Sequence, residues 1–181
     1  MDTIRIRQEP DYFPLLSGLK LTYNHTSTEF EVVELVEVVF QDVRAFRTDC
    51  VAKAVVTRTR MGQSKTETYG VKKSAKEVFT ENGPIGWGRK EFILPAVPGK
   101  EWIEEPDKHV IASIDERIET PAGIYMKCLR INSYLGGGDA GSAIRYYAPG
   151  VGYIYEEYSG EDEGARIVLT GFEMPKIARL Y

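Results

Sequence analysis

The sequence predicts an all-β fold, a single curved antiparallel sheet that meanders into a half-barrel or barrel with at most one or two short helices. Composition is the first indication. Val, Ile and Thr together number 41 of 181 residues, against 22 for Leu and Ala, and β-branched side chains favour strands. The second indication is a series of alternating segments separated by turn residues. These leave no space for the long crossover helices that parallel sheets require.

Composition also excludes several classes of protein. A hydrophobic share of 43% is too high for a disordered chain, and a mean hydropathy of −0.29 is too low for a membrane protein. The net charge of −4 and the pI near 5.4 argue against a nucleic-acid partner, because nucleic-acid binders carry a basic excess. With two His and two Cys, we expect neither a metal site nor a cofactor.

The first part of the chain divides into an irregular arm and the beginning of the sheet. We expect the arm over residues 1–14 and one antiparallel β domain over residues 15–181, since no linker interrupts the rest. Strict alternation in Leu19–Tyr23 places its apolar side chains on one face of a strand. Phe30–Phe40 holds five valines, which favours a strand buried on both faces. Ala45–Arg60 predicts a long strand with a hairpin return.

The second part of the chain predicts further strands, for a total of about ten. In Lys108–Ile118 the even positions Val110, Ala112, Ile114 and Ile118 are apolar, which predicts that they face inward. A Thr-Pro-Ala-Gly turn then leads to a return strand over Ile124–Tyr134. Three more strands are expected over Ser142–Tyr147, Val151–Tyr158 and Ala165–Phe172.

The most unusual feature is a cluster of five tyrosines beside Arg145, over residues 145–158. Tyr153 and Tyr155 would share one face by period 2. One interpretation is a ligand-binding surface formed by Arg145, Tyr147, Tyr153 and Tyr155, for an apolar or lipid-like molecule or a partner protein. The plainer alternative is that these side chains form a half-buried sheet face.

No motif for catalysis or metal binding stands out. His25 and His109 lack the spacing of metal ligands, so we expect structural or surface roles for both. Cys50 and Cys128 lie in apolar strand-like runs, which favours buried free thiols, although a disulfide in an oxidising compartment is the alternative.

The order of several segments resembles a loosely defined group of bacterial β-rich proteins, often secreted or lipid-anchored. The segments are Tyr12–Leu15, Pro95–Trp102, Glu119–Tyr125 and Tyr146–Gly152. The resemblance implies a strongly curved antiparallel sheet, similar to the half-barrels of periplasmic lipoprotein carriers, and implies no catalytic residues. This chain departs from the group because no signal peptide or lipid-anchor cysteine lies near its start. We therefore expect the cell envelope or secretion if a signal has been removed, and otherwise the cytoplasm.

These observations lead to one main functional hypothesis and two alternatives. The main hypothesis is a non-catalytic protein that binds an apolar ligand, a lipid or a protein on a concave Tyr-rich sheet face. The first alternative is a hydrolase with cleft carboxylates such as Asp115 or Glu116. The second is a structural component that pairs with a partner through its sheet edges. The oligomeric state is left open, and no transmembrane segment is expected.

Overall fold

The computed structural model describes residues 9–83, 87–137 and 141–175, and its regular elements are all β-strands. The predicted all-β class is confirmed, with twelve strands where the sequence indicated about ten. In chain order they are β1 (Lys20–Ser27), β2 (Phe30–Phe46), β3 (Asp49–Arg60), β4 (Gln63–Lys73), β5 (Glu77–Asn82), β6 (Trp87–Ile93), β7 (Glu101–Glu104), β8 (Asp107–Thr120), β9 (Gly123–Leu135), β10 (Gly141–Ala148), β11 (Gly152–Ser159) and β12 (Gly164–Glu173).

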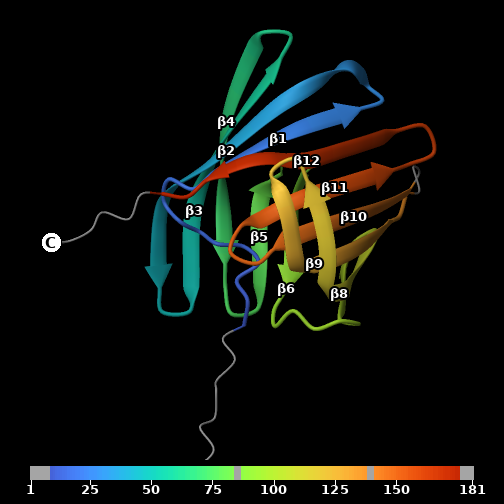
Figure 1. The fold of residues 1–181 in the computed structure, drawn as a ribbon. Helices are drawn as coiled ribbons and strands as arrows, with labels where there is room; N and C mark the ends of the chain where they lie inside the picture. The colour runs from blue at the N-terminus through green and yellow to red at the C-terminus, as the bar shows by residue number, and fades with distance from the viewer. Residues whose placement is uncertain (1–8, 84–86, 138–140, 176–181) are drawn as a thin grey trace, which may run out of the picture.

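The strands form one antiparallel sheet that curls into a nearly closed barrel (Figure 1). Its order is β6-β5-β4-β3-β2-β1-β12-β11-β10-β9-β8-β7, so the first and last strands are neighbours at the centre of the sheet. The two edge strands, β6 and β7, follow each other in the chain. Across this seam, the backbone N–H of Lys90 donates a hydrogen bond of 2.9 Å to Glu104 Oε1. The Glu104 side chain on β7 therefore links the two edge strands.

The predicted alternation of buried and exposed side chains holds best in β1. Leu19, Leu21 and Tyr23 are all buried, as predicted. In β2 the expectation of burial on both faces is wrong. Its even positions from Glu34 to Phe40 are buried, whereas Val33 is 54% exposed. A barrel wall has one inner and one outer face, so a run of valines need not be buried on both.

The predicted facing of β8 is wrong over residues 110–114, whereas Ile118 packs against the core as predicted. His109 and Ile111 are buried inside the barrel, while Ala112 and Ile114 are exposed. The β8–β9 pairing shifts its register three times between Ile111 and Ile118. β-Bulges of this kind rotate the side chains relative to simple alternation, and period-2 counting cannot anticipate them.

The segment before β1 enters one end of the barrel and packs there. Residues 1–8 of the predicted arm lie outside the described residues, and residues 9–14 contain no strand. Phe13 is buried, and its ring lies 6.0 Å from that of Phe40 and 6.3 Å from that of Tyr147, measured between centroids. The carbonyl of Asp11 accepts a hydrogen bond from the backbone of Gly150. The arm is thus packed into the barrel at this end.

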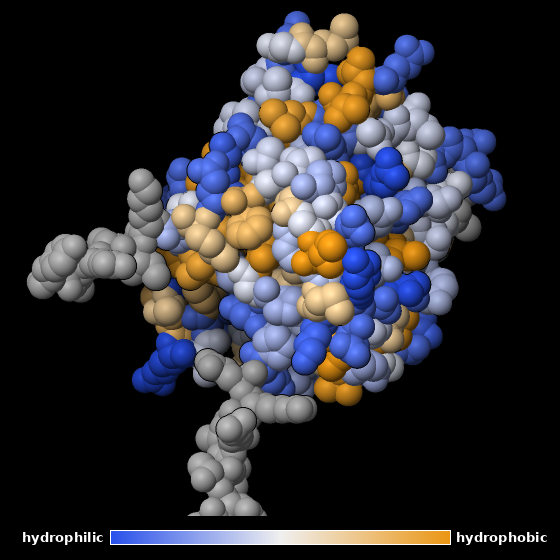
Figure 2. Space-filling view, viewed as in Figure 1, coloured by the Kyte–Doolittle hydropathy of each residue, from blue (hydrophilic) through white to orange (hydrophobic). Residues whose placement is uncertain are grey.

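The outer surface is mostly hydrophilic on the face seen in Figure 2, with apolar residues singly or in small groups. Apolar residues that are scattered singly over a surface need no special explanation. Among the described residues, no helix has the length and apolar character needed to cross a membrane.

Candidate functional site

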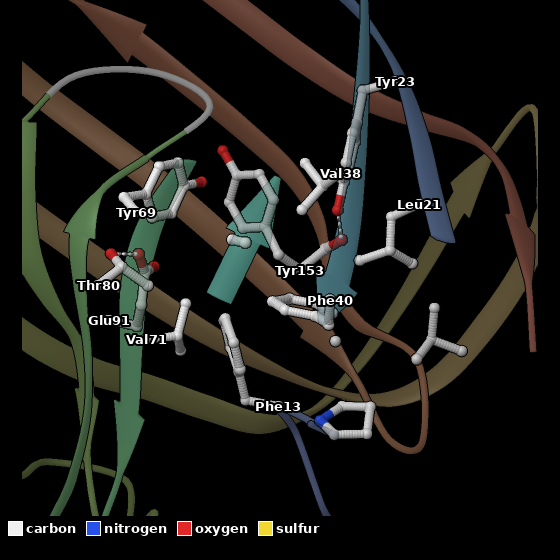
Figure 3. Close-up of a pocket in the computed structure, with 14 residues that line it drawn as sticks. Phe13, Leu21, Tyr23, Val38, Phe40, Tyr69, Val71, Thr80, Glu91 and Tyr153 are labelled. Carbon is white, nitrogen blue, oxygen red and sulfur yellow. Dashed lines mark hydrogen bonds between the residues drawn. The ribbon is translucent and has the colours of Figure 1, made fainter. Parts of the chain in front are cut away.

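The barrel interior has two different regions. The first, here called the apolar end, lies around Phe13, Tyr23, Phe40 and Tyr153 (Figure 3). It retains a space of only about 30 Å³, which is about enough for one water molecule. Tyr23 donates a buried hydrogen bond of 2.9 Å to the backbone carbonyl of Tyr153. This region is therefore a packed core.

A buried network of charges lies above the apolar end. Arg89 binds Glu156 through two parallel hydrogen bonds of 2.8 and 2.6 Å, the bidentate geometry that suits a guanidinium and a carboxylate. Arg89 Nε also lies 3.3 Å from both oxygens of Glu91. Arg145, whose side chain is 1% exposed, places Nη1 3.8 Å from Glu91 Oε2. Two arginines and two glutamates thus neutralise one another inside the barrel.

Two of the clustered tyrosines hold these glutamates in place. Tyr147 donates a hydrogen bond to Glu91 Oε2, and Tyr153 donates one of 2.6 Å to Glu156 Oε2. Burial, with the neighbouring carboxylates, raises the pKa of both tyrosines well above its ordinary value, so both hydroxyls stay protonated donors. Burial alone would raise the pKa of Glu91, but Arg89, Arg145 and the hydrogen bonds lower it overall. Glu91 is therefore ionised at neutral pH.

Beyond this network the barrel encloses the second region, a polar cavity of about 830 Å³. Arg89, Arg145 and Glu156 line it from the network, whereas Glu91, the fourth residue of the network, lines the apolar end. The ion pairs are therefore the boundary between the two regions. Seven carboxylate residues and three arginines line the cavity, and no lysine among the described residues does so.

One wall of the cavity is built around His109. Its Nδ1 lies 2.7 Å from Ser133 Oγ and 3.4 Å from Arg145 Nη2, and its ring stacks on Trp102 at 5.0 Å between centroids. Burial and the charges of Arg145 and Arg89 lower the pKa of His109 to about 4. The ring is therefore neutral, and because Arg145 can only donate, Nδ1 is the acceptor. Glu104 Oε2 lies 3.5 Å from the opposite nitrogen, Nε2.

The opposite wall carries a second histidine cluster. His25 Nδ1 lies 2.9 Å from Glu34 Oε2, and Arg58 Nη1 lies 3.0 Å from the same oxygen. Burial raises the pKa of Glu34, but the hydrogen bond from His25 and the charge of Arg58 lower it overall. The ionised carboxylate thus fixes the orientation of the His25 ring. Within the described residues, His25 Nε2 has no hydrogen-bond partner.

The mouth of the cavity is acidic. The exposed residues Glu29, Glu105 and Glu163 line it from the β1–β2, β7–β8 and β11–β12 turns. The first and third turns are tied together, since the backbones of Thr28 and Gly164 share a hydrogen bond of 2.9 Å. None of the three glutamates forms an ion pair with a lysine or arginine among the described residues. We call these three residues the acidic rim.

The structure brings three of the four predicted site residues into the interior. Arg145 lines the polar cavity, and Tyr147 and Tyr153 hold the glutamates beneath it. Tyr155 points away. A register shift in the β10–β11 pairing puts it opposite Tyr146, whose ring it contacts on the outer face. The expectation that Tyr153 and Tyr155 share a face is therefore wrong, because the bulge interrupts the period of 2.

The other sequence-based candidates lie elsewhere. Asp115 is exposed and Glu116 half-buried on β8, and neither lines either interior region. Cys50 and Cys128 are free thiols, as favoured from the sequence, but only Cys128 is buried and Cys50 is half-buried. No group of three or more His, Cys, Asp or Glu that would suit a metal ion occurs within the described part of the chain.

Sequence reasoning missed Arg89, Glu91, Glu104 and Glu156. Charged residues in a strand are ordinarily assigned to the solvent side, and here the inner face is the charged one. One signal was present, since Arg89 and Glu91 stand two apart in a short strand, which places both on one face. Their partner Glu156 comes from a distant strand, and only the barrel closure brings it near.

Comparison with known proteins identifies the fold alone. No family model and no curated protein sequence matches the chain. Two solved structures are similar over 100% of their own length. One is a protein from Bacteroides fragilis assigned as exported, with a YmcC-like fold (14% identity, 91% of this chain, TM-score 0.69). The other is a protein from Parabacteroides distasonis assigned as a lipoprotein (13% identity, 92% of this chain, TM-score 0.68). The fold is thus shared with bacterial proteins assigned to export or lipid anchoring.

Proposed function

We propose that this protein is a non-catalytic binding protein that holds a small hydrophilic ligand in its polar cavity. The observation that carries the proposal is the cavity of about 830 Å³, lined by charged and polar side chains inside a barrel whose other end is packed. Ligand sites in proteins measure roughly 300–1,000 Å³. Arg145 lines the floor of the cavity beside His109, and we assign it to the ligand.

The location of the cavity changes the ligand class that the sequence suggested. An apolar or lipid-like molecule would have to lie beside Tyr153, where Phe13 fills the barrel and about 30 Å³ remains. Tyr147 and Tyr153 serve the ligand indirectly in this proposal, by fixing the glutamates that hold Arg89 and Arg145. Tyr155, on the outer face, has no part in it.

The alternatives have less support. A glycosidase-type acid needs a carboxyl group with a raised pKa, whereas the pKa of Glu91 and of Glu34 is lowered. Assembly through sheet edges would use β6 and β7, but β7 has four residues and the backbone N–H of Lys90 on β6 is already bonded to Glu104. We further propose an envelope or secreted location, which the two similar structures assigned as exported and as a lipoprotein support.

Native mass spectrometry of the protein purified from its own host tests the proposal. We expect a discrete added mass under non-denaturing conditions that disappears on denaturation. Ala165→Trp, at a half-buried position in the cavity mouth, should abolish the added mass. Ala45→Trp, at an exposed position away from the cavity, is the matched control and should retain it. An added mass that survives Ala165→Trp, or equal native and denatured masses, would contradict a ligand in this cavity.

A further inference from the structure

The β3–β4 hairpin extends past β5, which leaves one side of β4 open (Figure 1). β4 pairs with β3 along its whole length, Gln63–Lys73, but its pairing with β5 covers only residues 71–73. Residues 63–68 are all exposed. Within the described part of the chain, no strand pairs with this side of β4 before Val71. The sheet therefore has an open edge in the middle of its strand order, in addition to β6 and β7.

The backbone of this edge is directed towards an absent neighbour. Alternate residues of an antiparallel strand direct their backbone groups to opposite sides of the strand. The N–H of Gly70 points away from β3, because it donates a hydrogen bond of 2.6 Å to Glu81 Oε2 on β5. The β3–β4 pairing is continuous from residue 63 to residue 73. Ser64, Thr66 and Thr68 therefore direct their N–H and C=O groups to the open side, as Gly70 does.

The side chains of this edge are complementary to a second copy of the same edge. In a two-fold antiparallel pairing centred on Thr66, Ser64 lies opposite Thr68 of the second copy, so all three outward residues form ladder bonds. The same register places Lys65 opposite Glu67 of the second copy, and two-fold symmetry repeats the contact. The two side chains already lie on one face of β4, since Lys65 Nζ is 2.6 Å from Glu67 Oε1. Opposite charges directly across a strand pair stabilise it.

The neighbouring registers are disfavoured by the same two side chains. A pairing centred on residue 65 puts Lys65 opposite its own copy, and one centred on residue 67 does the same for Glu67. Like charges directly opposite each other destabilise a strand pair. Charges on an edge strand ordinarily prevent pairing, whereas here they permit one register. We propose that two copies of this protein associate through their β4 edges, antiparallel and centred on Thr66.

The size of the contact sets the expected affinity. About seven residues of each copy take part, against roughly 20–30 a side in a stable complex. We therefore expect a weak dimer whose population depends on protein concentration. Lys65, Thr66 and Glu67 do not line the polar cavity, so this inference goes beyond the proposed function and can fail without it.

Sedimentation equilibrium of the full chain, from micromolar to millimolar concentration, tests this inference. We expect the average mass to rise from that of a monomer towards that of a dimer. Lys65→Glu and Glu67→Lys each place like charges opposite each other, and each should weaken dimerisation about fivefold or more. An equimolar mixture of the two variants should recover it, because an acidic edge then faces a basic one. Lys76→Glu, the same charge change at an exposed position outside this edge, is the control and should dimerise as the wild type does.

A backbone variant tests the ladder itself. Thr66→Pro removes an N–H on the open side of β4, where an edge strand tolerates proline, and should abolish dimerisation. Circular dichroism of each variant checks that the barrel is intact. A monomer at every concentration would overturn the inference and leave the edge to an extended segment of another protein. Equal dimerisation of Lys65→Glu and Lys76→Glu, or no recovery in the mixture, would overturn the proposed register.

Discussion

At one end of the barrel, aromatic side chains from the strands and from the preceding arm leave about 30 Å³, whereas the other end keeps about 830 Å³ open. Both ends are enclosed by the same antiparallel sheet. The two ends differ in the side chains that face inward. At the packed end the rings of Phe40 and Tyr147 pack against Phe13, whereas at the cavity end arginines and glutamates form ion pairs. A buried charge that loses its partner is strongly destabilised. The charged side chains therefore stay in their ion pairs and do not move inward to fill the cavity. One barrel therefore contains both a packed core and an open site, and the inward-facing side chains decide which end is which.

The largest effect should come from removing the aromatic ring that fills the packed end. Phe13→Ala is expected to lower the free energy of unfolding by about 4 kcal/mol, through lost burial and the cavity left behind. Chemical denaturation followed by tryptophan fluorescence measures it. Leu16→Ala, two residues after the arm and 42% exposed, should change it by less than about 0.5 kcal/mol. Similar values for the two variants would mean that the arm is not part of the core.

The polar half of the barrel should make the stability of the protein depend on pH. His109 has a pKa of about 4 in the folded protein against 6.5 for a free histidine, so the unfolded chain binds the proton first. Stability should therefore fall as the pH is lowered, by about 2 kcal/mol between pH 7 and pH 5 from this group. Denaturant unfolding of wild type and His109→Gln over this range isolates the contribution. Parallel pH profiles for the two proteins would contradict it.

The smallest expected effect distinguishes two tyrosines that the sequence treats alike. Tyr153→Phe removes a hydrogen bond to the buried carboxylate of Glu156 and should lower the free energy of unfolding by about 1.5 kcal/mol. Tyr155→Phe removes a bond to Glu157 at the surface and should change it by less than about 0.5 kcal/mol. Thermal unfolding at a single pH compares them. A reversed order would place the bulge in β11 elsewhere.

Much of the barrel was predictable because turns and alternation are local. The facing of Leu19–Tyr23 follows directly from polarity, and the long β3–β4 hairpin follows from a Met-Gly turn between alternating runs. The facing of β8 and of Tyr155 was not predictable in this way, since β-bulges break the period. Each bulge depends on pairing partners that a single strand does not show.

The candidate site was less predictable than the fold. Arg145 was found because it stands among tyrosines, yet the other residues that give the cavity its charge lie on β2, β3, β6, β7, β8, β11 and three turns. From the sequence, Glu91 and Glu156 resemble ordinary solvent-facing strand residues, and only the closure of the sheet brings them into the interior. In a polar interior the charged positions of a strand face inward, opposite to the usual hydrophobic pattern. Only the pairing of opposite charges in the folded structure reveals this.

The pairing of β1 with β12 has a consequence for how the chain folds. The other ladders join strands that are neighbours in sequence, so β1–β6 and β7–β12 are two local meanders. The ladder between them aligns Lys20 with Glu173, and closing so long a loop carries an entropic cost before any contact repays it. Folding should therefore be slow for a protein of this size, and neither meander can complete the core until the last strand arrives.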